Sequence, residues 1–157
     1  MKILVLSDVH ANFPALGAVL KVAPEHDELL CLGDIAGYGI QPNECCDLLR
    51  ERRAICLLGN HDAAALGHEI IERFKTSAQL SARWTASVLT QQNREFLGSL
   101  SPHQIWKEWD FEAVHASLDL PLECYIQGRY SAAKPLISYS ATYVFSATRT
   151  TRLRWRN

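Results

Sequence analysis

Three short apolar runs without polar alternation recur at nearly equal intervals along the first part of the chain. They span residues 2–6, 28–32 and 54–58. Runs of this length and composition predict strands that are buried on both faces. The segments between them, 13–22 and 42–52, carry apolar residues at helical spacing. This rhythm of strand, helix, strand, helix, strand is typical of βαβ units, so the sequence predicts an α/β fold.

The pattern of the rest of the chain predicts one long helix and three further strands. Residues 77–97 are expected to be helical, with Leu80, Trp84, Val88 and Leu89 on the apolar face. Strands are expected at 106–109, 111–114 and 141–145, the first two joined by a tight turn at Asp110. The tryptophans Trp84, Trp106 and Trp109 are expected in the core rather than against a ligand.

Composition limits the class of protein. The chain has 157 residues, 48% hydrophobic and 21% charged, with a formal net charge of -1, which suits a globular domain. This balance makes nucleic acid an unlikely partner. The longest apolar runs are too short to cross a bilayer, and the start has no signal-peptide pattern, so no membrane association and a cytoplasmic location are expected. The oligomeric state is not readable from the sequence.

The five cysteines carry no paired Cys-x-x-Cys spacing, and their number is odd. Cys31 and Cys56 lie inside predicted strands. Buried, reduced thiols are therefore expected, rather than a cysteine zinc site.

A polar motif follows each of four predicted strands. The motifs are Asp8-Val9-His10, Gly33-Asp34, Gly59-Asn60-His61-Asp62 and His115. Alone, each could be a helix cap or a turn. Together they mark the carboxyl ends of strands, where α/β sheets build their sites. Asp8 and His10 lie two apart, so on a regular strand they would point the same way.

The side chains of these motifs suit a metal centre. Asp8 and Asp34 offer carboxylates, His10 and His115 offer imidazoles, and Asn60 offers an amide oxygen. Such a set favours Mn, Fe, Zn or Mg over a soft thiolate-bound ion. A carboxylate between two cations can bridge them, and Asp34 is the natural candidate. Two ions about 3.5–4 Å apart can polarise a phosphoryl group and lower the pKa of a bridging water to about 7.

In this order the motifs resemble the calcineurin-like metallophosphoesterase superfamily. The segments 33–39, Pro42-Asn43-Glu44-Cys45 and Val114-His115-Ala116-Ser117 are similar to its small bacterial phosphodiesterase-like branch. The resemblance covers residues 1 to about 145. It implies a four-layer α/β/β/α sandwich and a small phosphoester substrate. It also implies two divalent ions among Mn, Fe, Ni, Zn and Mg, with Mn favoured.

The same resemblance implies a role for each site residue. Asp8 and His10 would bind the first metal, Asp34 would bridge both, and Asn60 and His115 would bind the second. His61 would contact the phosphate and help protonate the leaving-group oxygen, with Asp62 orienting it.

The chain departs from the superfamily after the strand at 141–145. The superfamily continues with Gly-His-Thr-His or a similar motif, whereas this chain reads Ser-Ala-Thr-Arg-Thr-Thr-Arg over 146–152 and has no histidine after His115. We hypothesise a shift of reading frame. With GC-rich codons for 146–152, reading from a T before the Ser146 codon spells Phe-Gly-His-Thr-His-His-Pro.

Residues 1–145 are accordingly expected to form an incomplete metallophosphoesterase domain, lacking the C-terminal part of the second sheet. Residues 146–157 are expected to be an aberrant basic tail that is out of frame. The expected function is phosphodiester or phosphomonoester hydrolysis by a bridging hydroxide, impaired in this chain. Two alternatives remain: an inactive protein-binding scaffold of the same fold, and a non-functional gene remnant. Uncovered sheet surface predicts that the chain aggregates when expressed alone.

Overall fold

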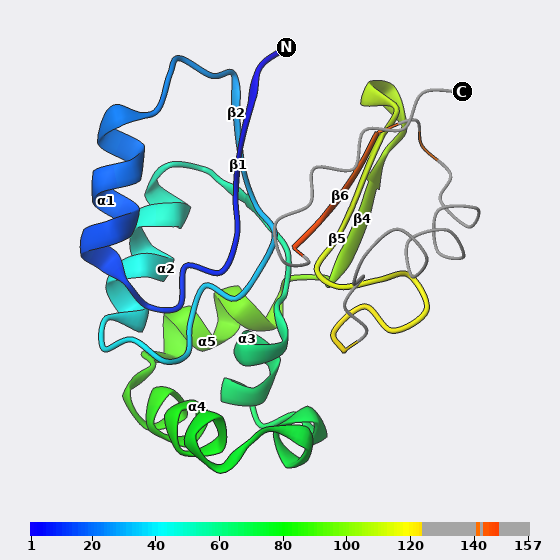
Figure 1. Ribbon diagram of the computed structural model, residues 1–157. Coiled ribbons are helices and arrows are strands. Elements are labelled where there is room, and N and C mark those ends of the chain that lie inside the picture. The colour runs from blue at the N-terminus through cyan, green and yellow to red at the C-terminus, as the bar shows by residue number, and fades with distance from the viewer. Residues whose placement is uncertain (124–140, 142, 148–157) are drawn as a thin grey trace.

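The structure is a computed structural model that describes residues 1–123, 141 and 143–147. Its described elements form three layers: helices, a first sheet and a second sheet (Figure 1). The helices are α1 (Phe13–Val22), α2 (Pro42–Glu51), α3 (Asn60–Ala65), α4 (Thr76–Val88) and α5 (Gln91–Gly98), with 3-10 turns η1 (Glu69–Arg73) and η2 (Lys107–Trp109). The strands are β1 (Ile3–Leu6), β2 (Glu28–Cys31), β3 (Ile55–Cys56), β4 (His103–Trp106), β5 (Phe111–Val114) and β6 (Tyr143–Ser146).

The first sheet confirms the predicted α/β rhythm. Its strands are parallel, in the order β1-β2-β3, and α1 and α2 connect them. Strand β2 shows why the runs lack polar alternation. Leu29 and Cys31 pack in the core beneath α1 and α2, whereas Leu30 and Leu32 pack against the second sheet with Trp106. Both faces of the strand are therefore dry.

The second sheet has the order β4-β5-β6, with β4 antiparallel and β6 parallel to β5. The prediction of a strand at 106–109 was wrong, because β4 ends at Trp106 and residues 107–109 form η2. The turn at Asp110 is confirmed, and this residue has a left-handed φ of 48°. Trp106 is buried as predicted, and Trp109 packs on it with ring centroids 6.3 Å apart.

The single helix expected at 77–97 is two helices. Leu89 leaves the helical conformation with a ψ of 130°, and Thr90 caps α5 by accepting a hydrogen bond from the Asn93 N–H. The expected apolar face was wrong at three of its four positions, whereas Leu89 is buried as predicted. Leu80, Trp84 and Val88 are exposed, with Leu80 at 64%, while small residues of α4 such as Ala82 face inward. The core side of α4 admits only small side chains because α3 packs closely against it.

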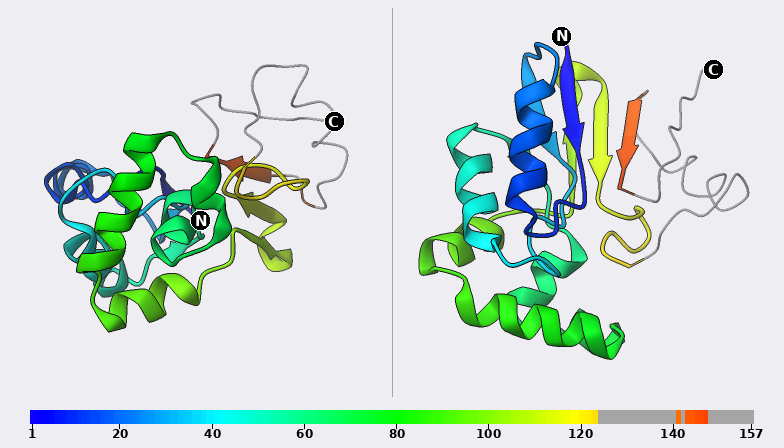
Figure 2. Two further views of the ribbon diagram at one scale, coloured as in Figure 1. Left: turned by 90° about the horizontal axis from the view of Figure 1, so that it is seen from below. Right: turned by 60° about the vertical axis from the view of Figure 1, so that its left-hand side comes forward.

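Helices α3, α4 and α5 lie beyond the carboxyl ends of β1 and β2, so they close that end of the sheet (Figures 1 and 2). Within the described residues no helix covers the outer face of the second sheet, where the expected sandwich has its fourth layer. Of the tail expected at 146–157, Ser146 is the last residue of β6 and Ala147 follows it, whereas residues 148–157 lie outside the described residues. The part of the second sheet that was expected to be missing would also follow residue 147. No helix among the described residues is long and apolar enough to span a membrane.

Candidate metal centre

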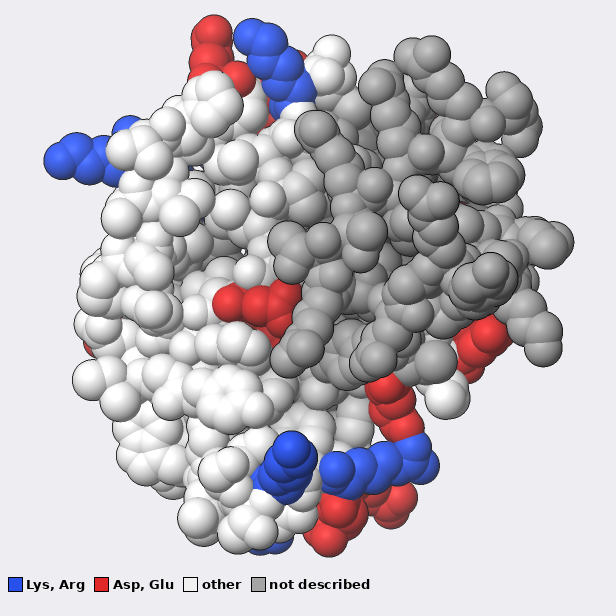
Figure 3. Space-filling view, viewed as in Figure 1, with Lys and Arg blue, Asp and Glu red and all other residues white. Residues whose placement is uncertain are grey.

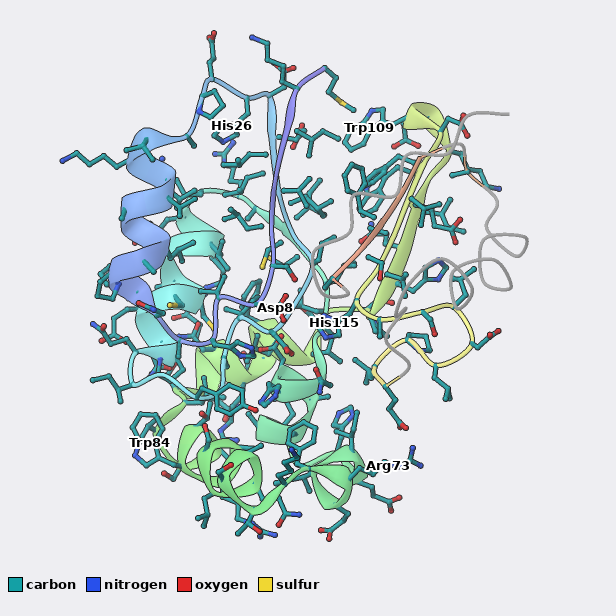
Figure 4. All side chains as sticks on the ribbon, in the orientation of Figure 1. Asp8, His26, Arg73, Trp84, Trp109 and His115 are labelled. Carbon is teal, nitrogen blue, oxygen red and sulfur yellow. The ribbon has the colours of Figure 1, made fainter. Side chains whose placement is uncertain are left out.

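The predicted ligands lie together where the carboxyl ends of the first sheet's strands meet the carboxyl end of β5. Figure 4 shows Asp8, from the first sheet, beside His115, which follows β5 of the second. In the space-filling view a small acidic patch lies near the centre, bordered on its left by uncharged surface (Figure 3). Asp8 is the exposed member of the set, whereas Asp34, Asn60 and His115 are buried.

A first group of donors comprises Asp8, His10 and Asp34. One ligand atom from each lies within 4.8 Å of the others. His10 Nε2 is 3.8 Å from Asp8 Oδ1 and 3.8 Å from Asp34 Oδ2. An ion with bonds of about 2.0–2.2 Å holds neighbouring ligand atoms roughly 3–4 Å apart. The spacing therefore fits a divalent cation between these three side chains.

A second group shares Asp34 with the first. His115 Nε2 lies 3.7 Å from Asp34 Oδ1 and 3.1 Å from Asn60 Oδ1. The two oxygens of Asp34 thus face different histidines, Oδ2 toward His10 and Oδ1 toward His115. This is the arrangement that a bridging carboxylate needs.

The hydrogen bonds of the two histidines favour metal binding through Nε2. His115 Nδ1 is 2.7 Å from the Leu32 carbonyl oxygen, and His10 Nδ1 is 3.4 Å from the Ala36 carbonyl oxygen. A carbonyl only accepts, so Nδ1 carries the proton and donates in each case. The Nε2 lone pairs then point toward the carboxylates, as metal-ligating histidines require. The donor set therefore fits the group that the sequence implied.

Asp8 and His10 are not brought together by the strand alternation that the sequence predicted. Strand β1 ends at Leu6, and both residues have left-handed φ values of 55° and 48°, so they do not share one face of a strand. Hydrogen bonds to the neighbouring loop place them instead. The Asp8 N–H donates to the Gly33 carbonyl at 3.1 Å, and the His10 N–H donates to the Asp34 carbonyl at 2.8 Å.

Two glycines of the motifs make room for the ligands. A Cβ on Gly59 would lie 2.1 Å from Asp34 Oδ1, and one on Gly33 would lie 2.8 Å from His115 Nδ1. Gly33 also has a φ of 104°, which side chains rarely allow. These two glycines therefore let the loops that carry the predicted ligands approach one another.

Asp62 joins the loops that carry the ligands. Its fully buried carboxylate accepts hydrogen bonds from the backbone N–H groups of Ile35, Ala36 and Gly59. Burial raises its pKa, and these hydrogen bonds oppose that rise. Its predicted role in orienting His61 stays a prediction. In that role Asp62 would act through the backbone, because its carboxylate accepts a hydrogen bond from the Gly59 N–H, two residues before His61.

His61 lies in an aromatic pocket. Its ring centroid is 4.5 Å from that of Tyr38, 4.6 Å from Phe74 and 5.0 Å from His10. Burial, followed by the nearby His10 and His115, lowers the pKa of His61 to about 4. Its Nδ1 has no hydrogen-bond partner among the described residues. The sequence reasoning missed Tyr38 and Phe74, although the glycines flanking Tyr38 were a signal of a tight loop.

The electrostatics of the centre favour a cation. Burial, together with Asp62 and Asp8, raises the pKa of Asp34 well above its usual value. Burial lowers the pKa of His115, so its ring is neutral and able to ligate. A divalent ion between these groups would offset the cost of burying negative charge.

Comparison with known proteins gives consistent results. A family model described as calcineurin-like phosphoesterase matches residues 1–147. An uncharacterized protein from Methanocaldococcus jannaschii is 41% identical over 100 residues, which are 62% of this chain and 41% of that protein. The crystal structure of a metallophosphoesterase from Sphaerobacter thermophilus has a TM-score of 0.80 and 36% identity, covering 93% of this chain and 59% of that one.

A hypothetical protein from Pyrococcus horikoshii has a TM-score of 0.78 at 17% identity, covering 92% of this chain and 68% of that one. At this identity the likeness shows the fold alone. The chain spans less than two thirds of the length of both the archaeal protein from Methanocaldococcus and the Sphaerobacter structure.

Proposed function

This chain belongs to the calcineurin-like phosphoesterase family, and on that premise we propose that it hydrolyses small phosphoesters with two bound divalent cations. The observation that carries the proposal is Asp34, whose two carboxylate oxygens face His10 and His115 separately. Mixed carboxylate, amide and imidazole donors suit manganese, which we favour among the candidate ions. We place the protein in the cytoplasm.

Each side chain has a proposed task. Asp8 and His10 would hold one ion, Asn60 and His115 would hold the other, and Asp34 would contact both. When bound, two such ions neutralise phosphoryl oxygens and activate water for attack on phosphorus. Asp62 fixes the loops around them through its three backbone hydrogen bonds.

His61 acts on the substrate rather than on a metal in this proposal. Because its pKa is about 4, the ring is neutral at pH 7 in the free protein. One ring N–H can then donate a hydrogen bond to a phosphate oxygen and later to the leaving-group oxygen. The aromatic rings of Tyr38 and Phe74 hold the imidazole in place for this contact.

The test is hydrolysis of bis-p-nitrophenyl phosphate and p-nitrophenyl phosphate with added Mn²⁺. The full chain and a version carrying Gly-His-Thr-His after β6 should be compared, each with its Asp34→Asn counterpart. We expect Mn²⁺-dependent release of nitrophenol by the repaired version, weaker release by the present chain, and none from either Asp34→Asn variant. Absence of hydrolysis by the repaired version with every candidate metal would refute the proposal.

We also propose that residues 1–145 form an incomplete metallophosphoesterase domain and that residues 146–157 are read out of frame. The lack of any histidine after His115 supports this. Sequencing the gene across the codons for residues 145–152 tests it. A corrected frame that spells Gly-His-Thr-His supports the proposal, whereas an unchanged sequence overturns it.

The same lack of histidines favours a second candidate, a binding scaffold that no longer catalyses. A scaffold would keep its fold and its melting temperature whether or not metal is present. An enzyme should bind Mn²⁺ and gain stability from it. Thermal melts with Mn²⁺ and with a chelator therefore separate these two functions.

A further inference from the structure

Tyr38 combines a strained backbone with an exposed aromatic ring. Its φ is 58°, in the left-handed region that bulky residues seldom adopt. Packing does not explain this, because the residue remains 55% exposed. Strain of this kind collects at functional sites, where a side chain is held ready for a ligand.

The loop around Tyr38 is fixed from several sides. The Tyr38 N–H donates to Ser81 Oγ of α4 at 2.6 Å, and the Gly39 N–H donates to the His10 carbonyl at 3.0 Å. A Cβ on Gly37 would lie 3.0 Å from the His61 ring, and one on Gly39 would lie 2.4 Å from the His10 carbonyl oxygen. The two glycines therefore let the loop press the Tyr38 ring against the site.

The contacts of the ring place it at the mouth of the metal centre. Its centroid is 4.5 Å from His61 and 4.9 Å from His10. Phe74 lies on His61 as well, but it is partly buried in the core beside α3. Of these two aromatic neighbours, Tyr38 is the one more than half open to solvent, and Ile40 beside it is 78% exposed.

We propose that Tyr38 binds the leaving group of the substrate, and that the preferred substrates are phosphoesters with a planar aromatic ring at or near the ester oxygen. This inference rests on the proposed function, in which His61 contacts the leaving-group oxygen. Because the exposed Tyr38 ring lies 4.5 Å from the His61 ring, a group attached to that oxygen would contact Tyr38 on its way to solvent. Two such rings prefer offset or edge-to-face contact.

The experiment measures binding, so it does not depend on turnover. Calorimetric titration of the full chain in Mn²⁺ compares phenyl phosphate with methyl phosphate, with inorganic phosphate as the reference. We expect phenyl phosphate to bind about three- to tenfold more tightly than methyl phosphate. Tyr38→Phe should keep that ratio, and Tyr38→Asn should bring it to about one, with inorganic phosphate measured on each variant so that any loss of phosphate affinity through His61 is subtracted.

Trp84→Leu is the matched control, because it removes an exposed aromatic ring from α4, away from Asp8 and His115 (Figure 4). It should leave the ratio unchanged. Thermal melts separate binding from a structural role. Asn tolerates left-handed φ, so Tyr38→Asn should melt at the same temperature as the parent or higher. A lower melting temperature would assign Tyr38 to stability instead.

The outcomes distinguish this inference from the function on which it rests. If phosphate ligands bind but the phenyl preference is absent, or survives in Tyr38→Asn, the assignment of Tyr38 is overturned and the function stands. If no phosphate ligand binds to the parent in Mn²⁺, the proposed function fails and this inference fails with it.

Discussion

Asp34 is a buried carboxylate, and its effect on the free energy of unfolding depends on whether a divalent cation is bound beside it. Its pKa is raised, chiefly by burial, so the folded chain holds the proton more tightly than the unfolded chain. This group therefore favours the fold below the unfolded pKa near 3.8, and that contribution is lost as pH rises through the folded pKa. At neutral pH without metal, Asp34 destabilises the protein.

Replacement of Asp34 by Asn should therefore stabilise the metal-free protein. The amide keeps the shape of the side chain and the 2.9 Å hydrogen bond from the His61 N–H to Oδ1. We expect a gain on the order of 1 kcal/mol at pH 7, about 2–4 °C in melting temperature, which shrinks toward pH 4. Melts of both proteins in a chelator across this pH range measure it, and a loss of stability at pH 7 would contradict it.

Metal should act in the opposite sense. Mn²⁺ at a hundred times its dissociation constant should stabilise the parent by about 2.7 kcal/mol. The gain should be largely absent in Asp34→Asn, because the carboxylate facing both histidines is gone. Melts with and without Mn²⁺ provide the measurement. An equal gain in both proteins would mean that the ion binds elsewhere.

The two histidines should divide the metal content between them. Native mass spectrometry should find up to two ions per chain in the parent, one in His10→Ala and one in His115→Ala. His26→Ala is the control, because its Nδ1 contacts the Pro24 carbonyl far from the centre. If native mass spectrometry finds only one ion in both the parent and His26→Ala, the chain has a single metal site and the two-metal proposal is rejected.

At the scale of elements, the paired helices α4 and α5 show where sequence periodicity fails. The spacing of Leu80, Trp84 and Val88 is helical, but these side chains face solvent. Leu80→Glu should therefore change the free energy of unfolding by less than about 0.5 kcal/mol. Leu97→Ala, at a fully buried position of α5, should cost about 2–5 kcal/mol. Urea titrations compare the two, and a large cost at Leu80 would restore the predicted face.

Other elements followed from the sequence because their patterns are local. Helix α1 begins at Phe13 and ends at Val22 as predicted, and the strand ends carry the motifs. The left-handed turn at Asp8 and His10 did not follow, because it depends on hydrogen bonds to a loop some 25 residues away in sequence, whose partners only the fold supplies. The pair His103 and Glu112, whose Nε2 and Oε1 atoms lie 2.7 Å apart on β4 and β5, also depends on a partner strand that only the fold supplies.

At the scale of the molecule, the reactivity of the cysteines tests whether the core is packed as described. The four described cysteines, Cys31, Cys45, Cys46 and Cys56, are free and buried. Burial raises the pKa of Cys45 to about 12 and that of Cys46 still higher, so little thiolate exists at pH 8. All four should resist maleimide labelling until the chain unfolds. Mapping by mass spectrometry checks this, and rapid labelling of these positions in native buffer would contradict the described core.

The register of β6 fixes where the following residues start. Val114 pairs with Ser146, and the Ala147 N–H donates to the His115 carbonyl at 3.0 Å. Whatever the gene encodes next therefore leaves the sheet next to a proposed metal ligand. The pairing of β6 thus fixes where the next residues begin, whereas the codons after β6 decide which side chains those residues carry. A change of reading frame at the codons after β6 would therefore remove or restore two histidines in one step, while the pairing of β4, β5 and β6 would stay as it is.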